Sequence, residues 1–145
     1  MEKEDFISGG TATVEMLDFL SECIRYGISV CIAGATSSGK TTVAGWLLTT
    51  IPDNKRIFTI ENGSRELSLI REQNGRVTNS VVHTLTRNSE NETYRIEQID
   101  LVDISLRFNP DIIVVGEMRG AEANAAQEVA RTGVGGGHYY PFKQL

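Results

Sequence analysis

Eight residues in the first third of the chain restrict its fold more than any other feature. Residues 34–41 read Gly-Ala-Thr-Ser-Ser-Gly-Lys-Thr, which is the spacing Gly-x4-Gly-Lys-Thr. The two glycines let the backbone adopt conformations that other residues resist, so the loop can wrap an anion with its N–H groups. The ammonium group of Lys40 and the hydroxyl of Thr41 follow directly. The pattern is typical of a loop that holds the phosphates of ATP, with the threonine hydroxyl as a ligand of Mg²⁺.

The segments on either side of this loop support that interpretation. Residues 28–33 form a short apolar run that predicts a buried strand, in which Cys31 should be inert. Residues 40–50 continue as a helix, whereas a chance match to the pattern would lack this strand and helix. The residues expected to bind nucleotide are Gly34, Ala35, Thr36, Ser37, Ser38, Gly39, Lys40, Thr41 and Thr42.

The rest of the chain alternates between strand and helix patterns. The predicted elements are helices at 11–26, 95–108 and 121–132, and strands at 56–60, 77–86 and 111–116. This alternation predicts an α/β fold of the RecA-like P-loop type, with a parallel sheet and helices on both faces. Residues 1–10 are expected to be a loose lead-in, residues 11–137 the core, and residues 138–145 an atypical C-terminal tail.

Composition narrows the function classes. A chain of 145 residues is long enough for one domain and too short for two. The net charge of -5 argues against broad capture of nucleic acid or an anionic membrane. Cys23 and Cys31 match no zinc spacing, which favours the reducing cytoplasm. No apolar run reaches the roughly 18 residues that cross a bilayer, so any membrane role is expected to come through partners.

Two glutamates follow predicted strands and are candidate catalytic groups. Hydrolysis of a nucleotide needs one acidic group near the metal and another to orient water. Glu61 follows the strand at 56–60, and Glu117 follows the strand at 111–116 in the manner of a Walker B element. Glu66 is expected either near the same site or solvated at a helix start. An ordinary solvated residue at a strand end is the alternative for Glu61 and Glu117.

Four stretches together resemble one known family, the type II and type IV secretion traffic ATPases and their relatives in type IV pili. They are residues 32–42, residues 56–62, residues 109–122 with their Pro-Asp-x4-Gly-Glu-x-Arg pattern, and residues 130–133. The resemblance is nearest to the CpaF-type branch that powers Flp/Tad pilus assembly. It implies Lys40 and Thr41 as the Walker A pair, Glu61 as a catalytic carboxylate, and Glu117 as the Walker B glutamate near Mg²⁺.

The resemblance also implies partners. It predicts a homo-hexameric ring, inner-membrane platform proteins and a location in the cytoplasm or at the inner face of that membrane. Arg87 is either a phosphate-neutralising residue in such a ring or a surface arginine. Arg119 is expected to pair with Glu117, cross a subunit boundary or remain solvated. His138 either stands in for a residue of the family's His box or belongs to the tail.

The chain departs from the family pattern in several places. The family's Asp box, in which Glu61 lies, often reads Glu-Asp, but here the second residue is Asn62. The segment after Gly133 differs from the usual continuation of the family's His box. We expect a core fragment without the family's N-terminal domain, which in the family helps to complete the nucleotide site. A nucleotide-binding module without turnover is therefore one alternative to a motor ATPase. A small-molecule or nucleoside kinase is another, although neither a lid nor an acceptor pocket is recognisable.

Overall fold

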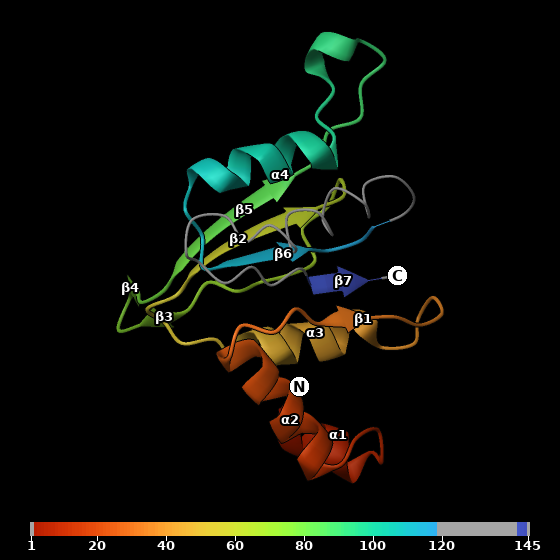
Figure 1. The fold of residues 1–145 in the computed structure, drawn as a ribbon, viewed down its shortest axis with the longest axis vertical. Coiled ribbons are helices and arrows are strands. Elements are labelled where there is room, and N and C mark those ends of the chain that lie inside the picture. Colours follow the sequence, from red (N-terminus) through yellow and green to blue (C-terminus); the bar gives the residue numbers. More distant parts are fainter. Residues whose placement is uncertain (1, 119–141, 145) are drawn as a thin grey trace.

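The protein forms a five-stranded parallel sheet that supports helices on both faces (Figure 1). The structure is a computed structural model that describes residues 2–118 and 142–144. The strand order is β1-β7-β6-β2-β5, with every neighbouring pair parallel. The strands are β1 (Cys31–Ile32), β7 (Phe142–Gln144), β6 (Ile112–Val115), β2 (Arg56–Glu61) and β5 (Ser80–Leu85). The predicted α/β fold is thus confirmed.

Alternating side chains of the central strands pack into two separate cores, one on each face of the sheet. On β6, Ile112 and Val114 join the core beneath helices α2 (Val14–Arg25) and α3 (Lys40–Thr49). Ile113 and Val115 join the opposite core, beneath α4 (Gln98–Arg107). Because consecutive strand residues point to opposite faces, a strand buried on both sides must be apolar throughout, as β6 is.

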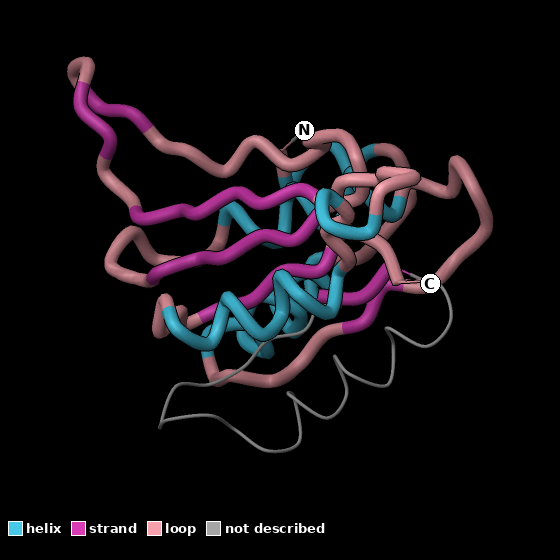
Figure 2. The backbone as a smooth tube through the Cα atoms, turned by 90° about the horizontal axis from the view of Figure 1, so that it is seen from above, coloured by secondary structure: helices cyan, strands magenta, loops and turns pink. Residues whose placement is uncertain are grey.

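A hairpin and a short helical turn lie outside these layers. Strands β3 (Glu72–Gln73) and β4 (Arg76–Val77) are antiparallel and project beyond one end of the sheet (Figure 2). Asn74 and Gly75 both have positive φ, as the turn between these strands requires. The 3-10 helix η1 (Glu92–Tyr94) lies in the loop that precedes α4.

The first ten residues were predicted to be a loose lead-in, and this was wrong. They contain helix α1 (Lys3–Ser8), whose start is fixed by a capping box between Glu2 and Asp5. Phe6 is buried, and its ring centre lies 5.7 Å from that of Trp46 on α3. The aromatic contact explains why so short a helix persists, since short helices depend on tertiary packing.

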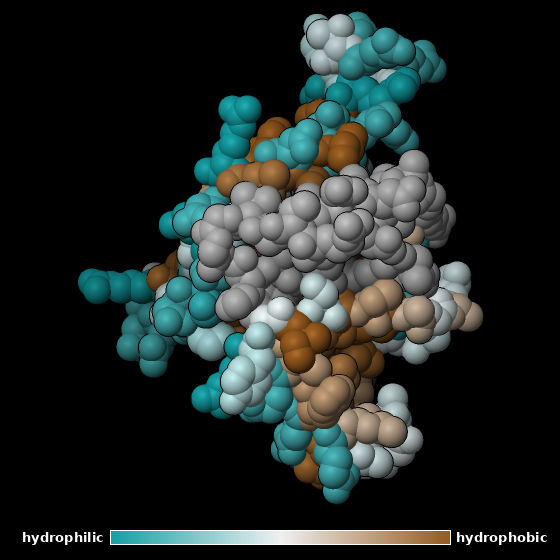
Figure 3. Space-filling view, viewed as in Figure 1, coloured by the Kyte–Doolittle hydropathy of each residue, from teal (hydrophilic) through white to brown (hydrophobic). Residues whose placement is uncertain are grey.

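Helix α2 matches its prediction in position, although part of its apolar surface faces outward. Thr13 caps its start by accepting a hydrogen bond from the Met16 amide at 3.3 Å. Leu17 is buried on α2, whereas the side chains of Met16 and Phe19 are exposed. Apolar surface is visible over the N-terminal helices in the lower half of Figure 3.

Strand β1 is shorter and more exposed than its apolar sequence predicts. Only Cys31 and Ile32 pair, and β1 forms the edge of the sheet. Cys31 is exposed, so the prediction of an inert buried thiol was wrong. An apolar run predicts a strand without revealing whether that strand will be central or at an edge.

The predictions for the C-terminal part divide between described and undescribed residues. The strand β7 within the expected tail was not predicted, and it pairs in parallel with both β1 and β6. The helix predicted at 121–132 lies outside the described residues. Within the described ranges, no helix combines the length and apolar character needed to span a membrane.

Candidate nucleotide-binding site

The loop between β1 and α3 has the backbone shape that its glycines predict. Gly39 is the N-cap of α3 with φ of 86°, and Ser37 also has a positive φ of 62°. A Cβ atom added to Gly34 would lie 2.6 Å from the Ser38 hydroxyl oxygen, so a larger residue would force the Ser38 side chain to move. The Ser38 amide donates to the Ala35 carbonyl at 3.2 Å. The loop is therefore a tight turn that opens onto the start of a helix.

Lys40 places its charge at the mouth of this loop. Its Nζ donates to the Ala35 carbonyl at 2.8 Å, which folds the side chain back over the loop. The start of α3 adds the positive end of a helix dipole, and its first turn contains no acidic residue. An ammonium group, a helix start and a glycine-bounded turn together form a setting for an anion.

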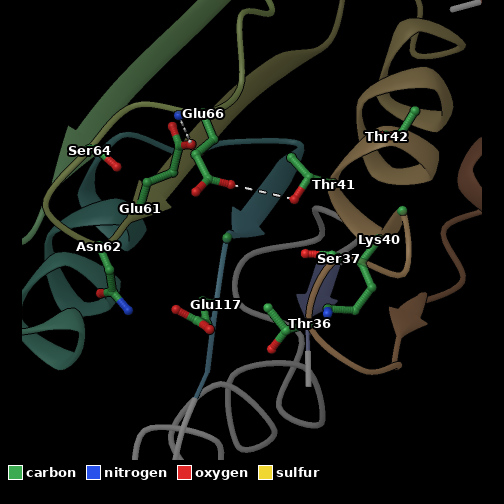
Figure 4. A pocket seen from close by; sticks show the side chains of 12 residues that line it. Thr36, Ser37, Lys40, Thr41, Thr42, Glu61, Asn62, Ser64, Glu66 and Glu117 are labelled. Atoms are coloured by element: carbon green, nitrogen blue, oxygen red, sulfur yellow. Dashed lines mark hydrogen bonds between the residues drawn. The ribbon is translucent and has the colours of Figure 1, made fainter.

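A cavity of about 380 Å³ lies between this loop and the carboxyl ends of β2 and β6 (Figure 4). One wall comes from the loop and α3, and the other comes from residues that follow the two strands. The lining residues are Thr36, Ser37, Gly39, Lys40, Thr41, Thr42, Glu61, Asn62, Ser64, Glu66, Gly116 and Glu117. The structure thus brings most of the predicted loop residues together with both predicted carboxylates.

Glu66 is the carboxylate that reaches the loop most directly, and the sequence left its place open. Its Oε2 lies 3.4 Å from the Thr41 hydroxyl, which donates to it. In Figure 4 the two side chains face each other across the cavity. The available signal was a second glutamate five residues after the strand-end Glu61.

Glu61 is buried and holds the turn that carries Glu66. Its side chain Oε1 accepts hydrogen bonds from the backbone amides of Glu66 at 2.8 Å and Leu67 at 2.9 Å. Gly116 packs against it, since a Cβ on Gly116 would lie 3.2 Å from the Glu61 Cγ. Glu61 is therefore anchored through one oxygen, and it is also one of the residues that line the cavity.

His83 on β5 contacts the same carboxylate from the neighbouring strand. Its Nδ1 lies 2.9 Å from the Thr59 hydroxyl and 3.8 Å from Glu61 Oε2. Burial lowers the pKa of His83, and the nearby Arg65 cation lowers it further, while Glu61 opposes both effects. At neutral pH the ring is therefore neutral, and its contact with Glu61 is not an ion pair.

Acidification is expected to destabilise the protein through His83. Its folded-state pKa lies below the ordinary value of about 6.5, so the unfolded chain takes up the proton first as the pH falls. The contribution to stability is present above that ordinary value and is lost as the pH falls through the folded pKa. Urea unfolding at pH 7.5 and pH 5.5 should show a larger loss for wild type than for His83→Gln. Equal losses in the two proteins would contradict this assignment.

The remaining predicted residues divide into one inside the cavity, one outside it and two that are not described. Glu117 lines the cavity directly after β6, where the Gly116 amide donates to the Ile60 carbonyl at 2.8 Å. Arg87 does not line it, because its Nε donates to the Tyr94 carbonyl at 2.6 Å in the loop before α4. Arg119 and His138 lie outside the described residues.

The oxygen atoms around the cavity suit Mg²⁺ better than a softer metal. Thr41, Glu66 and Glu117 supply hydroxyl and carboxylate oxygens. Among the described residues, no group of three or more His, Cys, Asp or Glu side chains forms a metal cage. Hydroxyl and carboxylate oxygens are the hard ligands that Mg²⁺ takes beside waters and the phosphates of its nucleotide.

The parallel sheet and its glycine-bounded loop before α3 define an α/β protein of the P-loop class. A sequence profile of the family described as "Type II/IV secretion system protein" matches residues 4–140, and the chain belongs to this family. PtlH, a type IV secretion system protein of Bordetella pertussis, is 35% identical over 120 residues, which are 83% of this chain and 34% of PtlH. An uncharacterized protein of Methanocaldococcus jannaschii is 35% identical over 128 residues, which are 88% of this chain and 22% of that protein.

Solved structures agree with the family assignment. The VirB11 ATPase of the Brucella suis type IV secretion system, in complex with sulphate, matches with a TM-score of 0.67 and 25% identity. That match covers 97% of this chain and 37% of VirB11. The Legionella pneumophila ATPase DotB matches with a TM-score of 0.57 and 27% identity, over 92% of this chain and 35% of DotB. The chain spans less than half the length of these relatives, and the comparisons do not single out the CpaF-type branch.

Proposed function

We propose that this chain is the ATP-binding and ATP-hydrolysing part of a motor that drives secretion or pilus assembly. The observation that carries the proposal is the single cavity in which the loop at residues 34–41 faces Glu66 and Glu117. Family membership and the likeness to two proteins titled as ATPases point the same way.

The loop side of the cavity binds the phosphates in this proposal. The backbone amides of the loop and the start of α3 surround the anion, and Lys40 transfers its hydrogen bonds from the Ala35 carbonyl to phosphate oxygens. The Thr41 hydroxyl binds Mg²⁺, which neutralises charge that develops on the phosphates. Thr36 and Thr42 line the cavity beside these groups.

The strand side of the cavity supplies the carboxylates. Glu66 polarises the attacking water because its carboxylate accepts the hydrogen bond of the Thr41 hydroxyl, and Glu61 holds the Glu66 turn through two backbone amides. Glu117 follows β6 on the same side of the cavity, where it holds Mg²⁺ directly or through water. This division gives Glu61 a supporting part in catalysis rather than the direct contact with water.

The assembly and its location are also proposals. In this proposal the chain is part of a hexameric ring in the cytoplasm, as the family resemblance implies. The ring works against platform proteins at the inner membrane.

A titration of the wild-type protein tests the proposal. We expect the heat of binding measured by calorimetry to show saturable binding of ATP in the presence of Mg²⁺, followed by release of inorganic phosphate. Chelation of Mg²⁺ with EDTA should abolish the release. Saturable binding without release would favour a nucleotide-binding module. A folded protein that shows no binding of ATP in the presence of Mg²⁺ would contradict the proposal altogether.

A further inference from the structure

Gln98 is a buried polar residue close to the cavity, and the roles proposed above leave it unused. It is the first residue of α4 and is 5% exposed, whereas its neighbours Glu97 and Ile99 are exposed. A buried amide group needs hydrogen-bond partners, because leaving its polar atoms unpaired costs free energy. The partners of Gln98 therefore indicate what keeps it inside.

The side-chain nitrogen of Gln98 ties together the ends of two neighbouring strands. Nε2 donates to the Asn62 side-chain oxygen at 2.9 Å and also to the backbone carbonyl of Glu117. An amide nitrogen carries two hydrogens, so both are engaged. Asn62 follows β2 and Glu117 follows β6. The side-chain Oε1 has no hydrogen-bond partner among the described residues, so its donor end holds Gln98 in place.

Asn62 extends this connection to a third strand. Its side-chain oxygen also accepts from the Thr86 hydroxyl at 3.3 Å, and Thr86 follows β5. The backbone amide of Thr86 donates to the Glu61 carbonyl at 2.9 Å. Asn62, the departure from the Asp box, is thus an acceptor shared by two donors.

The start of α4 fixes Gln98 from the other side. Glu97 caps the helix, and its backbone amide donates to the Asp100 carboxylate at 2.8 Å in a reciprocal capping box. Leu101 and Val102 bury the first turn of α4 against the sheet. The helix therefore presents the Gln98 amide group from a rigid base, as a positioning group requires.

We propose that Gln98 is a positioning residue that sets where Glu117 lies in the cavity. The inference rests on the proposed ATPase function, in which Glu117 acts near Mg²⁺. Glu117 lies beyond the last paired residue of β6, so strand pairing alone does not fix its place. The hydrogen bond to its carbonyl fixes the backbone from which its carboxylate projects. A small displacement of a reacting group lowers the rate of the chemical step more than it lowers substrate affinity.

Steady-state phosphate release from Gln98→Met tests this role. Methionine has a similar length and fills the buried space without donating a hydrogen bond. We expect kcat to fall about 10- to 100-fold, because Glu117 loses its fixed position relative to the loop at residues 34–41. KM for MgATP should stay within about twofold, because the loop at residues 34–41 is not touched.

Ser105→Ala is the matched control on the same helix. Ser105 is fully buried, and its hydroxyl donates to the Val102 carbonyl within α4, away from the cavity. This variant perturbs α4 without breaking the link to Glu117, so its kcat should remain near that of wild type. Equal losses of kcat in the two variants would assign Gln98 a structural role only and overturn the proposal.

An NMR measurement separates the contact from the reaction. The Met118 amide belongs to the same peptide group as the Glu117 carbonyl, so its ¹⁵N shift should change in nucleotide-free Gln98→Met. The amides of residues 34–41 should not change. An unmoved Met118 resonance, or a moved resonance with unchanged kcat, overturns the inference. A wild-type protein that releases no phosphate would instead contradict the proposed function, while the Met118 shift would still decide whether Gln98 holds Glu117.

Discussion

Replacing Lys40 with alanine is expected to lower phosphate release from MgATP by at least about 100-fold and to weaken nucleotide binding. Lys40 is the cation at the mouth of the loop, and its Nζ already lies 2.8 Å from a loop carbonyl that a phosphate oxygen would replace. Alanine keeps the helix, so circular dichroism and thermal unfolding should change little. Calorimetric titration and a phosphate-release assay measure the two effects separately.

Lys55→Ala provides the control for charge. It removes the same positive charge from a residue next to β2, where Lys55 pairs with Asp111 at 3.4 Å and does not line the cavity. Binding and release should remain near the wild-type values, because an exposed ion pair contributes little. Similar losses in the two variants would mean that net charge, and not the loop, governs the interaction.

Replacing Glu66 with glutamine is expected to lower phosphate release by about 100-fold or more while MgATP binding stays within a few-fold. Glutamine keeps the size of the side chain and removes the negative charge that polarises water. Glu66 is exposed, and its backbone amide rather than its side chain bonds Glu61. The unfolding free energy should therefore be unchanged, which urea titration can measure.

Glu61→Ala separates the two glutamates. Two amides, one of them on buried Leu67, would lose their acceptor, and the unfolding free energy should fall by about 1–3 kcal/mol. Glu66→Gln should show lost turnover without lost stability, and Glu61→Ala should show both losses. If Glu66→Gln retained full turnover, Glu66 could not be the group that acts on water.

Local patterns predicted the elements that depend on local chemistry. The apolar runs at 56–60 and 111–116 became β2 and β6, and the loop at residues 34–41 leads into α3 as expected. The two strand-end glutamates also reached one cavity. These predictions succeeded because a run of β-branched residues and a Gly-x4-Gly-Lys-Thr spacing each have few structural solutions.

Features that depend on distant contacts were not predictable in this way. Helix α1 depends on the packing of Phe6 against Trp46, and no local sequence pattern predicts that contact. The sequence left open whether Glu66 faces the cavity, because its orientation follows from the two amides that Glu61 captures. No sequence pattern singles out Gln98, since a single glutamine at a helix start is usually solvated. Its role depends on Asn62 and Glu117, which lie on two other elements.

The position of β7 has a consequence for the order in which the sheet forms. Strand β1, which carries the phosphate-binding loop, pairs through Cys31 with Lys143 and does not pair directly with β6. The strand that joins them is β7, which lies far along the sequence from β1. Contacts between such distant segments form slowly. The loop then gains its fixed place opposite Glu117 only after β7 has paired with both β1 and β6, which makes the assembly of the cavity a late step of folding.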